Sequence, residues 1–565
     1  MRRQTQQRVL ALAVVLGAAV LSASGPPLAM QDSWVFDGGD WQFVDKMLTQ
    51  SDPATIVHAH YTSQAYGDCT VGVRFRAYED GKGVKAAGLI LRSQDSLSGY
   101  SVHYDTKNDQ VILSRLQFGV GRVELGRQRH IKMETGTWYA AEAAATGGAV
   151  SARLDGKTIL SVEDPTPLPP GISGVYSSQG KIDFAAFRVD GVPRELRHPW
   201  RRRMRYEAPK DQSIAVIDWI KPICKEPGRY IGWPTICRRT DGELLAVFSG
   251  DRDAHVCPWG KVQLVRSSDD GESWSEPVSI CCTPLDDRDA GIIETAEGDL
   301  VVNWFTSLAF ERPNAPEVWQ RHAEKLTPEI RDQWLGYWTR RSTDGGKTWR
   351  EPVKHQANAP HGGIRLRDGR LLFVGKCPVD GRTTLIAEAS RDGGRSWQKI
   401  GTIAQDPADD PNQYFEPHVA ETADGRLVAM FRYHYRDPKT GRRNLEKCFL
   451  RQSESSDGGH SWTTCHTTPL KGYPPHVLCL ADGTLLCVYG RRCAPHGEYA
   501  CISRDGGRTW LVEDEVCLAT ATSGDLGYPA STQLPDGSII TVYYQIAAPG
   551  EKTCLMATRW RLKSH

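Results

Sequence analysis

Six pairs of short apolar segments occupy the C-terminal part of the chain, and each pair flanks an Asp-Gly or Glu-Gly dipeptide. Around the fifth dipeptide, for example, the apolar run 477–480 precedes the turn and the run 485–489 follows it. Apolar strands joined through such a turn predict antiparallel β-hairpins. The dipeptides begin at Asp241, Glu297, Asp368, Asp424, Asp482 and Asp536, at intervals of 54 to 71 residues. This interval is close to the length of a four-stranded propeller blade and predicts six blades over residues 212–565, the last completed by a strand near 212–219.

Residues 31–193 follow a different pattern, with short alternating segments and no repeated turn. Val71, Val73 and Phe75 alternate with polar or small residues, and similar runs occur at 100–104, 110–116 and 183–189. Alternation with a period of two predicts strands with one buried face. The segment resembles the concanavalin-like jelly rolls found beside secreted glycosidases, and the resemblance implies a β-sandwich domain.

Two roles are open for residues 31–193: a packing domain, or a carbohydrate-binding module. For the second role, the candidates for stacking on sugar rings are Trp34, Trp41, Tyr100 and Tyr104. The segment 194–211 that follows is rich in arginine, which favours a solvated linker over a binding site.

The first 30 residues predict a signal peptide. Arg2, Arg3 and Arg8 precede the apolar run 9–20, and small residues follow it. This is the order of the three regions of a cleavable export signal. The apolar run is too short to span a bilayer, so we expect a secreted or periplasmic protein without stable membrane insertion after cleavage.

The net charge and the cysteine content limit the classes of partner and ligand that we expect. Lys and Arg total 69 and Asp and Glu total 68, which leaves a net charge of +1 and argues against nucleic acid as a partner. The 15 cysteines are an odd number, and their spacing matches no zinc pattern. We expect few disulfides, no structural metal and no cofactor, whereas the oligomeric state is left undefined.

An eight-residue motif, Ser-x-Asp-x-Gly-x-x-Trp, recurs five times. Its copies occupy residues 267–274, 342–349, 390–397, 455–462 and 503–510. Gly permits a tight turn, and the Ser and Asp side chains can bond to nearby backbone N–H groups. These copies resemble the Asp-boxes of the sialidase superfamily, and the resemblance implies a six-bladed β-propeller with the boxes on the outer part of the blades.

The six turns also provide a register that compares the blades with one another. In a propeller, the first strand of each blade runs from the mouth of the central funnel down to its Asp-Gly turn. Residues eight positions before each turn should therefore converge on one opening. These residues are Trp233, Asp289, Pro360, Glu416, Pro474 and Tyr528.

Glu416 and Tyr528 carry the strongest resemblance to a catalytic site. The segments FEPHVAETADGRLVAMFR and GYPASTQLPDG around them are similar to the sialidase segments that hold the assisting glutamate and the nucleophilic tyrosine. The resemblance implies that Tyr528 attacks the substrate and that Glu416 is its base. A neutral phenol is suited to a sugar that bears a carboxylate beside its anomeric carbon, because a carboxylate nucleophile would be repelled.

Arginines are predicted to bind the substrate carboxylate. Arg432 and Arg491 match two of the three arginines that sialidases use for this purpose, and Arg491 is chosen over Arg492 on approximate spacing. The third is missing, since Gly232 stands where sialidases place the arginine of an Arg-Ile-Pro tripeptide. Trp233 beside it offers a ring for a sugar to stack on, and Arg252 is a candidate to compensate.

A general acid and a group of histidines complete the candidate site. Asp253 fits the placement of the family's acid best, and Asp289 is the alternative. His361, His418 and His476 each follow a proline at the start of a blade. They are candidates to bind a sulfated or uronic sugar, to act as acid and base, to hold a metal or to have a purely structural role.

The leading hypothesis is a secreted sialidase-like exo-glycosidase that hydrolyses a terminal acidic sugar, sialic acid or a related one, with retention through Tyr528 and Glu416. A second hypothesis is a propeller lyase or glycosidase that acts on polysaccharides of uronic acids or deoxysugars with a histidine base. A third is a propeller that binds glycans without catalysis, because Asp-boxes also occur in proteins with no hydrolytic activity.

Overall fold

The computed structural model describes most of the chain after residue 32. The described residues are 33–37, 40–51, 57–78, 86–96, 98–117, 121–178, 180–196, 200, 207–379, 381–437, 440–442, 444, 447–493, 495–521, 523–548 and 551–563. The predicted signal peptide at 1–30 lies outside them. None of the helices in this part of the chain is long and apolar enough to cross a membrane.

The N-terminal strands form one antiparallel sheet of 13 strands, ordered β11-β10-β9-β4-β12-β5-β6-β7-β8 with β1, β2, β3 and β13 attached at its side. The two ends of this path, β11 and β8, contact each other, so the sheet folds back around one hydrophobic core. The strands are β1 (Trp34–Asp37), β2 (Trp41–Val44), β3 (Met47–Gln50), β4 (Val57–Ala77), β5 (Ala86–Asp95), β6 (Ser98–Asp105), β7 (Gln110–Gln117), β8 (Gly121–Arg129), β9 (Tyr139–Thr146), β10 (Ala149–Leu154), β11 (Lys157–Glu163), β12 (Gly171–Ser178) and β13 (Ile182–Arg194).

The aromatic residues predicted to stack on sugars belong to this core. Trp34 is 6% exposed, and Tyr100 and Tyr104 are fully buried. The hydroxyl of Tyr100 donates to Asp164, and that of Tyr104 donates to the backbone carbonyls of Glu142 and Arg153. Trp41 packs on Phe36 and Phe184. The prediction of a stacking surface from these four residues is wrong for the three buried ones, because alternate strand positions point into the core.

Residues 215–562 form six sheets of four antiparallel strands each, which confirms the predicted six-bladed β-propeller. The first blade consists of β15 (Tyr230–Arg238), β16 (Leu244–Arg252), β17 (Lys261–Ser267) and β18 (Val278–Cys281), and the second of β19 (Asp286–Glu294), β20 (Leu300–Ser307), β21 (Tyr337–Ser342) and β22 (Val353–His355). The third consists of β23 (Ile364–Arg365), β24 (Leu371–Val379), β25 (Arg382–Ser390) and β26 (Gln398–Ile403), and the fourth of β27 (Tyr414–Glu421), β28 (Leu427–Tyr433), β29 (Arg451–Ser455) and β30 (His466–Thr467). The fifth consists of β31 (Pro475–Cys479), β32 (Leu485–Arg491), β33 (Gly497–Ser503) and β34 (Val516–Thr520).

All six Asp-Gly or Glu-Gly turns join the first and second strands of a blade, as predicted. In each turn the glycine has a positive φ, from 82° at Gly537 to 97° at Gly242. Its N–H closes a turn on the carbonyl three residues earlier, as from Gly483 to Leu480 at 2.9 Å. Only glycine adopts this backbone conformation without steric cost, which explains the repeat. We call the opposite end of the blades the rim end.

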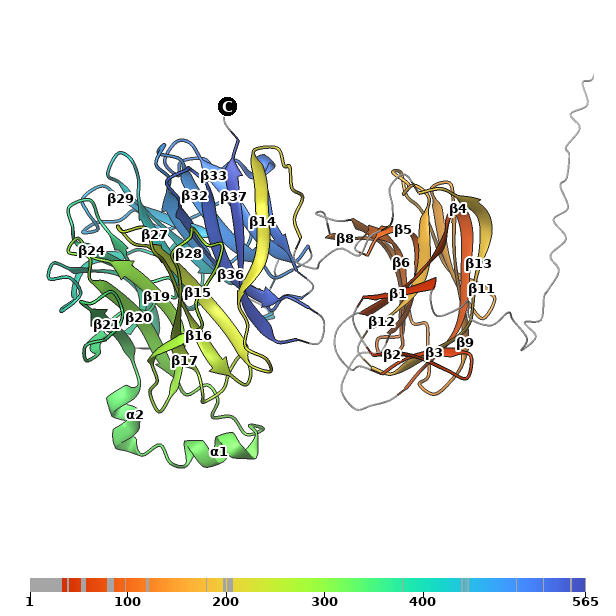
Figure 1. Cartoon of the computed structure of the whole chain (residues 1–565), viewed down its shortest axis with the longest axis horizontal. Helices are drawn as coiled ribbons and strands as arrows, with labels where there is room; N and C mark the ends of the chain where they lie inside the picture. The colour runs from red at the N-terminus through yellow and green to blue at the C-terminus, as the bar shows by residue number, and fades with distance from the viewer. Residues whose placement is uncertain are drawn as a thin grey trace, which may run out of the picture.

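The sixth blade closes the ring with a strand from each side of the propeller sequence. It consists of β35 (Gly527–Gln533), β36 (Ile539–Ile546), β37 (Thr553–Leu562) and β14 (Ala215–Cys224). In Figure 1 the yellow β14 lies beside the blue β37, as the pairing of Ala215 with Leu562 requires. The predicted closing strand is thereby confirmed, and it removes an exposed sheet edge.

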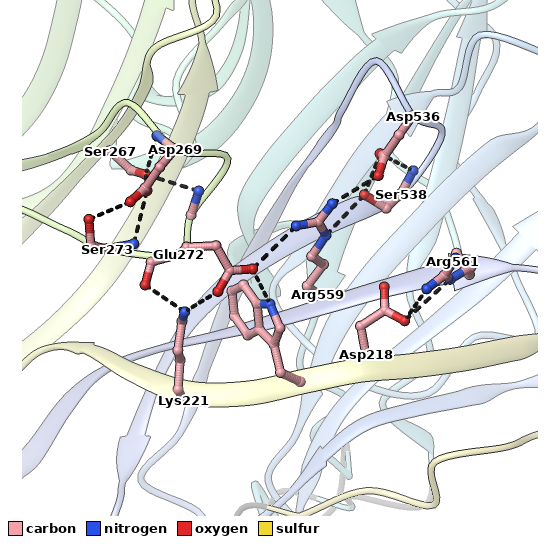
Figure 2. Close-up of polar contacts among 12 residues, drawn as sticks. Asp218, Lys221, Ser267, Asp269, Glu272, Ser273, Asp536, Ser538, Arg559 and Arg561 are labelled. Atoms are coloured by element: carbon pink, nitrogen blue, oxygen red, sulfur yellow. Dashed lines mark hydrogen bonds and ion pairs between the residues drawn. The ribbon is translucent and has the colours of Figure 1, made fainter.

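A polar network spans the seam between the sixth and first blades (Figure 2). Lys221 of β14 donates to Glu272 in the first Asp-box, and Arg559 of β37 contacts both Glu272 and Asp536. In the same Asp-box, Ser267 and Ser273 bond to Asp269. The network lies at the strand ends that carry the Asp-Gly turns, away from the rim end.

The five Asp-boxes connect the third and fourth strands of blades one to five, on the outer part of each blade. In every box the serine Oγ accepts the N–H of the glycine four residues later, as in Ser455 and Gly459 at 3.0 Å. The Asp side chain caps the following turn, as in Asp457 and Ser461. The boxes are therefore structural, as the resemblance implied.

The second blade carries a helical insertion between β20 and β21. It contains α1 (Glu317–Ala323) and α2 (Pro328–Trp334), which lie below the strands in Figure 1. Thr327 caps α2 by accepting the N–H of Ile330, and Pro328 occupies its first turn. Because β20 runs away from its Glu297-Gly298 turn, the insertion lies at the rim end.

All 15 cysteines fall within the described residues, and all are free thiols. Cys487 and Cys501, which face each other on neighbouring strands, are completely buried. Burial raises the pKa of both thiols, so they behave as small apolar side chains.

Candidate active site

Four of the six register positions adopt an unusual backbone conformation. Trp233, Asp289, Glu416 and Tyr528 have φ values of 57°, 51°, 46° and 53°. At each of them the pairing between the first and second strands shifts, so that two residues oppose one. Each is therefore a β-bulge with a non-glycine residue in the left-handed region.

The bulges determine where these side chains point. A bulge rotates its residue out of the regular alternation and is common beside active sites, and a left-handed non-glycine residue costs on the order of 1–3 kcal/mol. The other two register positions are Pro360 and Pro474, whose rings do not permit a positive φ. Since the first strands of neighbouring blades contact each other around the centre, the bulges direct four side chains to the centre of the rim end.

Tyr528 and Glu416 are bonded to each other there. The Tyr528 hydroxyl donates to Glu416 Oε1 at 2.6 Å, and Arg432 Nη1 donates to Glu416 Oε2 at 2.5 Å. Arg432 Nε lies 2.5 Å from His434 Nε2. Tyr528 is 4% exposed and the Glu416 side chain 19%. The pair predicted from the register thus lies together in the structure, joined to one of the predicted arginines.

The surroundings set the protonation of this pair. Burial acts to raise the pKa of Glu416, but the charge and hydrogen bond of Arg432, with the Tyr528 hydroxyl, lower it to about 2. Burial, Glu416 and Asp289 raise the pKa of Tyr528 well above its usual 10, against the lowering effect of Arg432 and Arg492. At neutral pH the pair is a carboxylate that accepts a hydrogen bond from a neutral phenol.

Two further cations lie close to the pair. The Arg492 guanidinium is 5.5 Å from the Tyr528 ring centroid, and its Nη2 donates to the Tyr544 hydroxyl at 3.1 Å. Lys376, on β24, lies 4.6 Å from the centre of the Phe415 ring. Burial lowers the pKa of Lys376, and Glu416 and Asp289 act to raise it, so these charges interact with one another.

Arg491 is placed elsewhere. Its Nη2 donates to both oxygens of Glu515 at 2.6 and 2.7 Å, and its guanidinium lies over the Tyr499 ring at 4.1 Å. Adjacent residues of a strand point to opposite faces, so only one of the two arginines can face Tyr528. The structure places Arg492 there, and Arg492 replaces Arg491 in the candidate site.

Trp233 does not offer a free stacking face, contrary to the prediction. It is 1% exposed, with the guanidinium groups of Arg252 and Arg288 over its ring at 4.8 and 4.4 Å. Arg252 is itself completely buried and forms a bidentate ion pair with Asp286, with distances of 2.6 and 2.8 Å. Both residues therefore build the wall of the site, and Arg252 has no guanidinium surface left for a substrate carboxylate.

Gly232 lies against two aromatic rings. A Cβ atom at this position would lie 3.3 Å from the Tyr230 ring and 3.7 Å from the Tyr544 ring. The two tyrosines therefore line the space beside the position where sialidases place the arginine. Arg288 brings a cation from the neighbouring blade instead, with its side chain 12% exposed and its Nε 3.9 Å from Asp289 Oδ1.

The two predicted acids have different environments. Asp253 follows β16 on the rim; its side chain is 35% exposed, and it is bonded to Arg229 at 2.5 Å and to the Trp319 indole N–H at 3.3 Å. Asp289 is 6% exposed, and its Oδ1 has no hydrogen-bond partner among the described residues. Burial raises the pKa of Asp289 to about 6, against the lowering effect of Arg288.

The three predicted histidines cluster in the interior. The rings of His418 and His476 stack at 4.2 Å, and His361 lies 5.2 Å from His476 and 5.9 Å from the Tyr528 ring. Exposure is 1% for His361, 3% for His418 and 5% for His476. Burial lowers the pKa of all three, to about 3 for His418, so the cluster is uncharged. Within the described residues, no group of His, Cys, Asp and Glu is arranged to hold a metal ion.

Sequence reasoning missed Arg288 as a site residue and did not select Lys376 or Arg492. Lys376 and Arg492 are eight and ten positions after an Asp-Gly turn, on chain segments that return toward the same opening, but this spacing alone could not rank them. Arg288 directly precedes the bulge at Asp289, where the regular alternation of side chains is interrupted. The sequence pattern does not show where a bulge interrupts the alternation of side chains.

Comparisons with known proteins agree with this fold. A family model described as a BNR repeat-like domain matches residues 286–414. A sialidase of Bacteroides fragilis (strain YCH46) is 25% identical over 335 residues, which are 50% of this chain and 55% of that protein. The chain thus spans about half the length of this curated relative.

A solved structure shows the same fold. A crystal structure of a protein of unknown function from Dyadobacter fermentans is 23% identical, with a TM-score of 0.52, over 62% of this chain and 99% of that chain. The NanB sialidase of Streptococcus pneumoniae is 11% identical, with a TM-score of 0.45, over 87% of this chain and 94% of that chain.

The repeated turns, the five structural boxes and the closed ring of four-stranded sheets define an Asp-box β-propeller. Within this class, the chain is similar to the sialidases: part of it matches the BNR repeat-like model, and half of it aligns with the Bacteroides fragilis sialidase.

Proposed function

We propose that the chain is an exo-glycosidase that hydrolyses a terminal acidic sugar, sialic acid or a related one, with retention of configuration. The observation that supports this most directly is the 2.6 Å hydrogen bond between Tyr528 and Glu416 inside a group of cations. In the mechanism, Tyr528 Oη bonds to the anomeric carbon as the bond from that carbon to the glycosidic oxygen breaks; the Tyr528 proton passes to Glu416 Oε1, and the departing oxygen takes a proton from a general acid. Water then attacks the anomeric carbon, gives one proton to the same group, which now acts as a base, and displaces Tyr528, which recovers its proton from Glu416.

The arginines around the Tyr528–Glu416 pair account for substrate binding and for the moment at which the Tyr528 proton moves to Glu416. Arg288, Arg432 and Arg492 offer guanidinium groups to a substrate carboxylate, which binds such groups through charge-assisted hydrogen bonds. A carboxylate bound to Arg432 takes over part of the charge that now stabilises ionised Glu416. Glu416 becomes more basic as a result, and it does so only when the substrate is present.

The arrangement favours hydrolysis over the two alternatives. A lyase would need a histidine base exposed to substrate, but His361, His418 and His476 are at most 5% exposed and have lowered pKa values. A non-catalytic binding protein would have no need for four strained bulges or for a buried Tyr–Glu pair. The absent first-blade arginine leaves the identity of the acidic sugar open to related acids as well as sialic acid.

The test is a screen of fluorogenic sialosides, Kdo-type glycosides and uronic glycosides. Wild-type protein should release the fluorophore from at least one acidic glycoside, and Tyr528→Phe should lower kcat/KM by about 1,000-fold or more. Tyr489→Phe is the matched control, because it removes another buried hydroxyl bonded to a carboxylate, Glu515, outside the site. Undiminished activity of Tyr528→Phe would refute the nucleophile, and unsaturated products from a uronate polymer would establish the lyase instead.

We also propose that the protein is exported through residues 1–30 and that residues 31–193 form a separate β-sandwich domain beside the propeller. The arginine and apolar pattern supports the first, and the single core around the 13-stranded sheet supports the second. Sequencing the N-terminus of protein recovered outside the producing cell tests export.

A further inference from the structure

A histidine lies at the rim end next to the bulge of the first blade. His255 follows β16, two residues after Asp253, and its side chain is 45% exposed. Its ring meets the edge of Trp233 at 4.9 Å and an interplanar angle of 82°. Tyr528 meets the same Trp233 ring at 6.3 Å and 81°. His255 and Tyr528 are therefore both neighbours of one buried indole.

Hydrogen bonds fix the orientation of the His255 ring. The Tyr230 hydroxyl donates to Asp525 Oδ1 at 2.7 Å, and its oxygen lies 2.8 Å from His255 Nδ1. Because the hydroxyl proton is used on Asp525, the tyrosine oxygen accepts from Nδ1–H. The exchangeable nitrogen of His255 is then Nε2. The Asp525 carboxylate, whose Oδ1 is 3.5 Å from Nδ1, compensates the charge of a protonated ring.

The groups around His255 and Asp525 connect these two residues to Tyr528. Burial acts to raise the pKa of Asp525, but His255, Tyr230 and Arg492 lower it, so it is ionised. The Tyr544 hydroxyl also lies 3.4 Å from Asp525 Oδ1, and Arg492 donates to Tyr544. Arg492 in turn lies over Tyr528, so the chain of contacts from His255 ends at the nucleophile.

Exposure distinguishes His255 from Asp289, and hydrogen bonding distinguishes it from Asp253. The leaving group of an exo-glycosidase extends toward solvent, so its proton donor must be accessible at the rim. Asp289 is 6% exposed, and Asp253 has its carboxylate engaged by Arg229 and Trp319. His255 lies on the same loop as Asp253, and its ring contacts the wall of the site at Trp233.

We propose that His255 is the general acid and base of the glycosidase, positioned by Tyr230 and Asp525; this rests on the proposed function. Protonated His255 gives its Nε2 proton to the glycosidic oxygen as the bond from that oxygen to the anomeric carbon breaks. Tyr528 Oη bonds to the same carbon and passes its proton to Glu416. Neutral His255 then removes a proton from the water that displaces Tyr528, and Tyr528 recovers its proton from Glu416.

The experiment compares two glycosides of the sugar that wild-type protein cleaves: an aryl glycoside whose phenolate leaves without a proton, and an alkyl glycoside that needs one. For His255→Gln, we expect kcat/KM to fall about 100- to 10,000-fold on the alkyl glycoside and less than about 10-fold on the aryl glycoside. Asp525→Asn should show the same selective loss, but a smaller one, because it removes only the positioning contact.

His322→Gln is the matched control, since His322 is a rim histidine on α1 that bonds to the Pro284 carbonyl and packs on Trp259. It should leave both rates unchanged. Equal losses on both glycosides for His255→Gln would mean a structural role and overturn the proposal, and so would a selective loss in Asp253→Asn or Asp289→Asn with none in His255→Gln. If wild-type protein cleaves no acidic glycoside, the proposed function fails, and the role of His255 with it.

Discussion

At the scale of single residues, the site is built from groups kept in unfavourable states. Asp289 is the clearest case, since it combines a left-handed backbone, near-complete burial and an oxygen without a hydrogen-bond partner among the described residues. Burial raises its pKa from 3.8 to about 6. The folded protein therefore binds the Asp289 proton more tightly than the unfolded chain does, so stability falls as the pH rises from about 3.8 to about 6 and the full cost remains above pH 6.

Asp289→Asn should stabilise the propeller. Removing an ionised buried carboxylate should raise the free energy of unfolding by about 3 kcal/mol at pH 8, and the gain should vanish below about pH 3.8, where Asp289 is protonated in both states. Thermal unfolding of wild type and variant at several pH values measures this. Asp286→Asn is the control on the same strand: it breaks the buried pair with Arg252 and should destabilise by about 3–5 kcal/mol. A destabilised Asp289→Asn at pH 8 would contradict the account.

The register predicted which residues meet but not how they are protonated or which face they use. Counting back from the Asp-Gly turns brought Glu416 and Tyr528 together because the turn fixes the start of the hairpin in every blade. Trp233 has the same register, yet two guanidinium groups cover it. Burial by residues from other blades is a tertiary property, and no spacing in the sequence carries it.

At the scale of elements, strand alternation separates neighbouring residues of identical type. Arg491 is the last residue of β32 and pairs with Glu515, whereas Arg492 points to Tyr528. The sequence could place both near the rim but could not choose, because a shift of one residue reverses the faces. The helices α1 and α2 were not predicted either, although the second interval between turns is the longest of the five and marks an insertion in that blade.

Because Arg491 and Arg492 point to opposite sides, their substitution by lysine should affect kcat/KM differently. Arg492→Lys should lower kcat/KM for the acidic substrate about 30-fold or more, because a single ammonium replaces the paired donors that face the site. Arg491→Lys should change it less than about 3-fold, since its partner is Glu515 on the outer side. Steady-state kinetics on the cleaved glycoside measures both. The reverse order of the two effects would show that Arg491 is the substrate ligand.

At the scale of the whole molecule, the propeller is closed by strands that are far apart in sequence. β14 pairs with β37 from Ala215 and Leu562 to Cys224 and Leu555, and Ala215 and Ile217 join Trp560 in one buried cluster. The sequence predicted this closure because six hairpins with five Asp-boxes left one blade without its outer strand. The two-domain organisation is a prediction of a different kind, since it rests on a change of pattern near residue 194.

This closure predicts where the chain can be shortened. A chain that begins at Glu207 retains β14 and every residue of the candidate site, so it should fold and keep the glycosidase activity. A chain that begins at Pro227 lacks β14, which leaves the backbone groups of β37 unpaired and exposes Trp560 and Leu518 of the same cluster. It should aggregate or unfold at a markedly lower temperature. Thermal unfolding and activity of the two chains, beside the mature protein, measure this. Loss of activity in the chain from Glu207 would mean that the N-terminal sheet contributes to the propeller or its site, and a stable, active chain from Pro227 would mean that β14 is dispensable for closure.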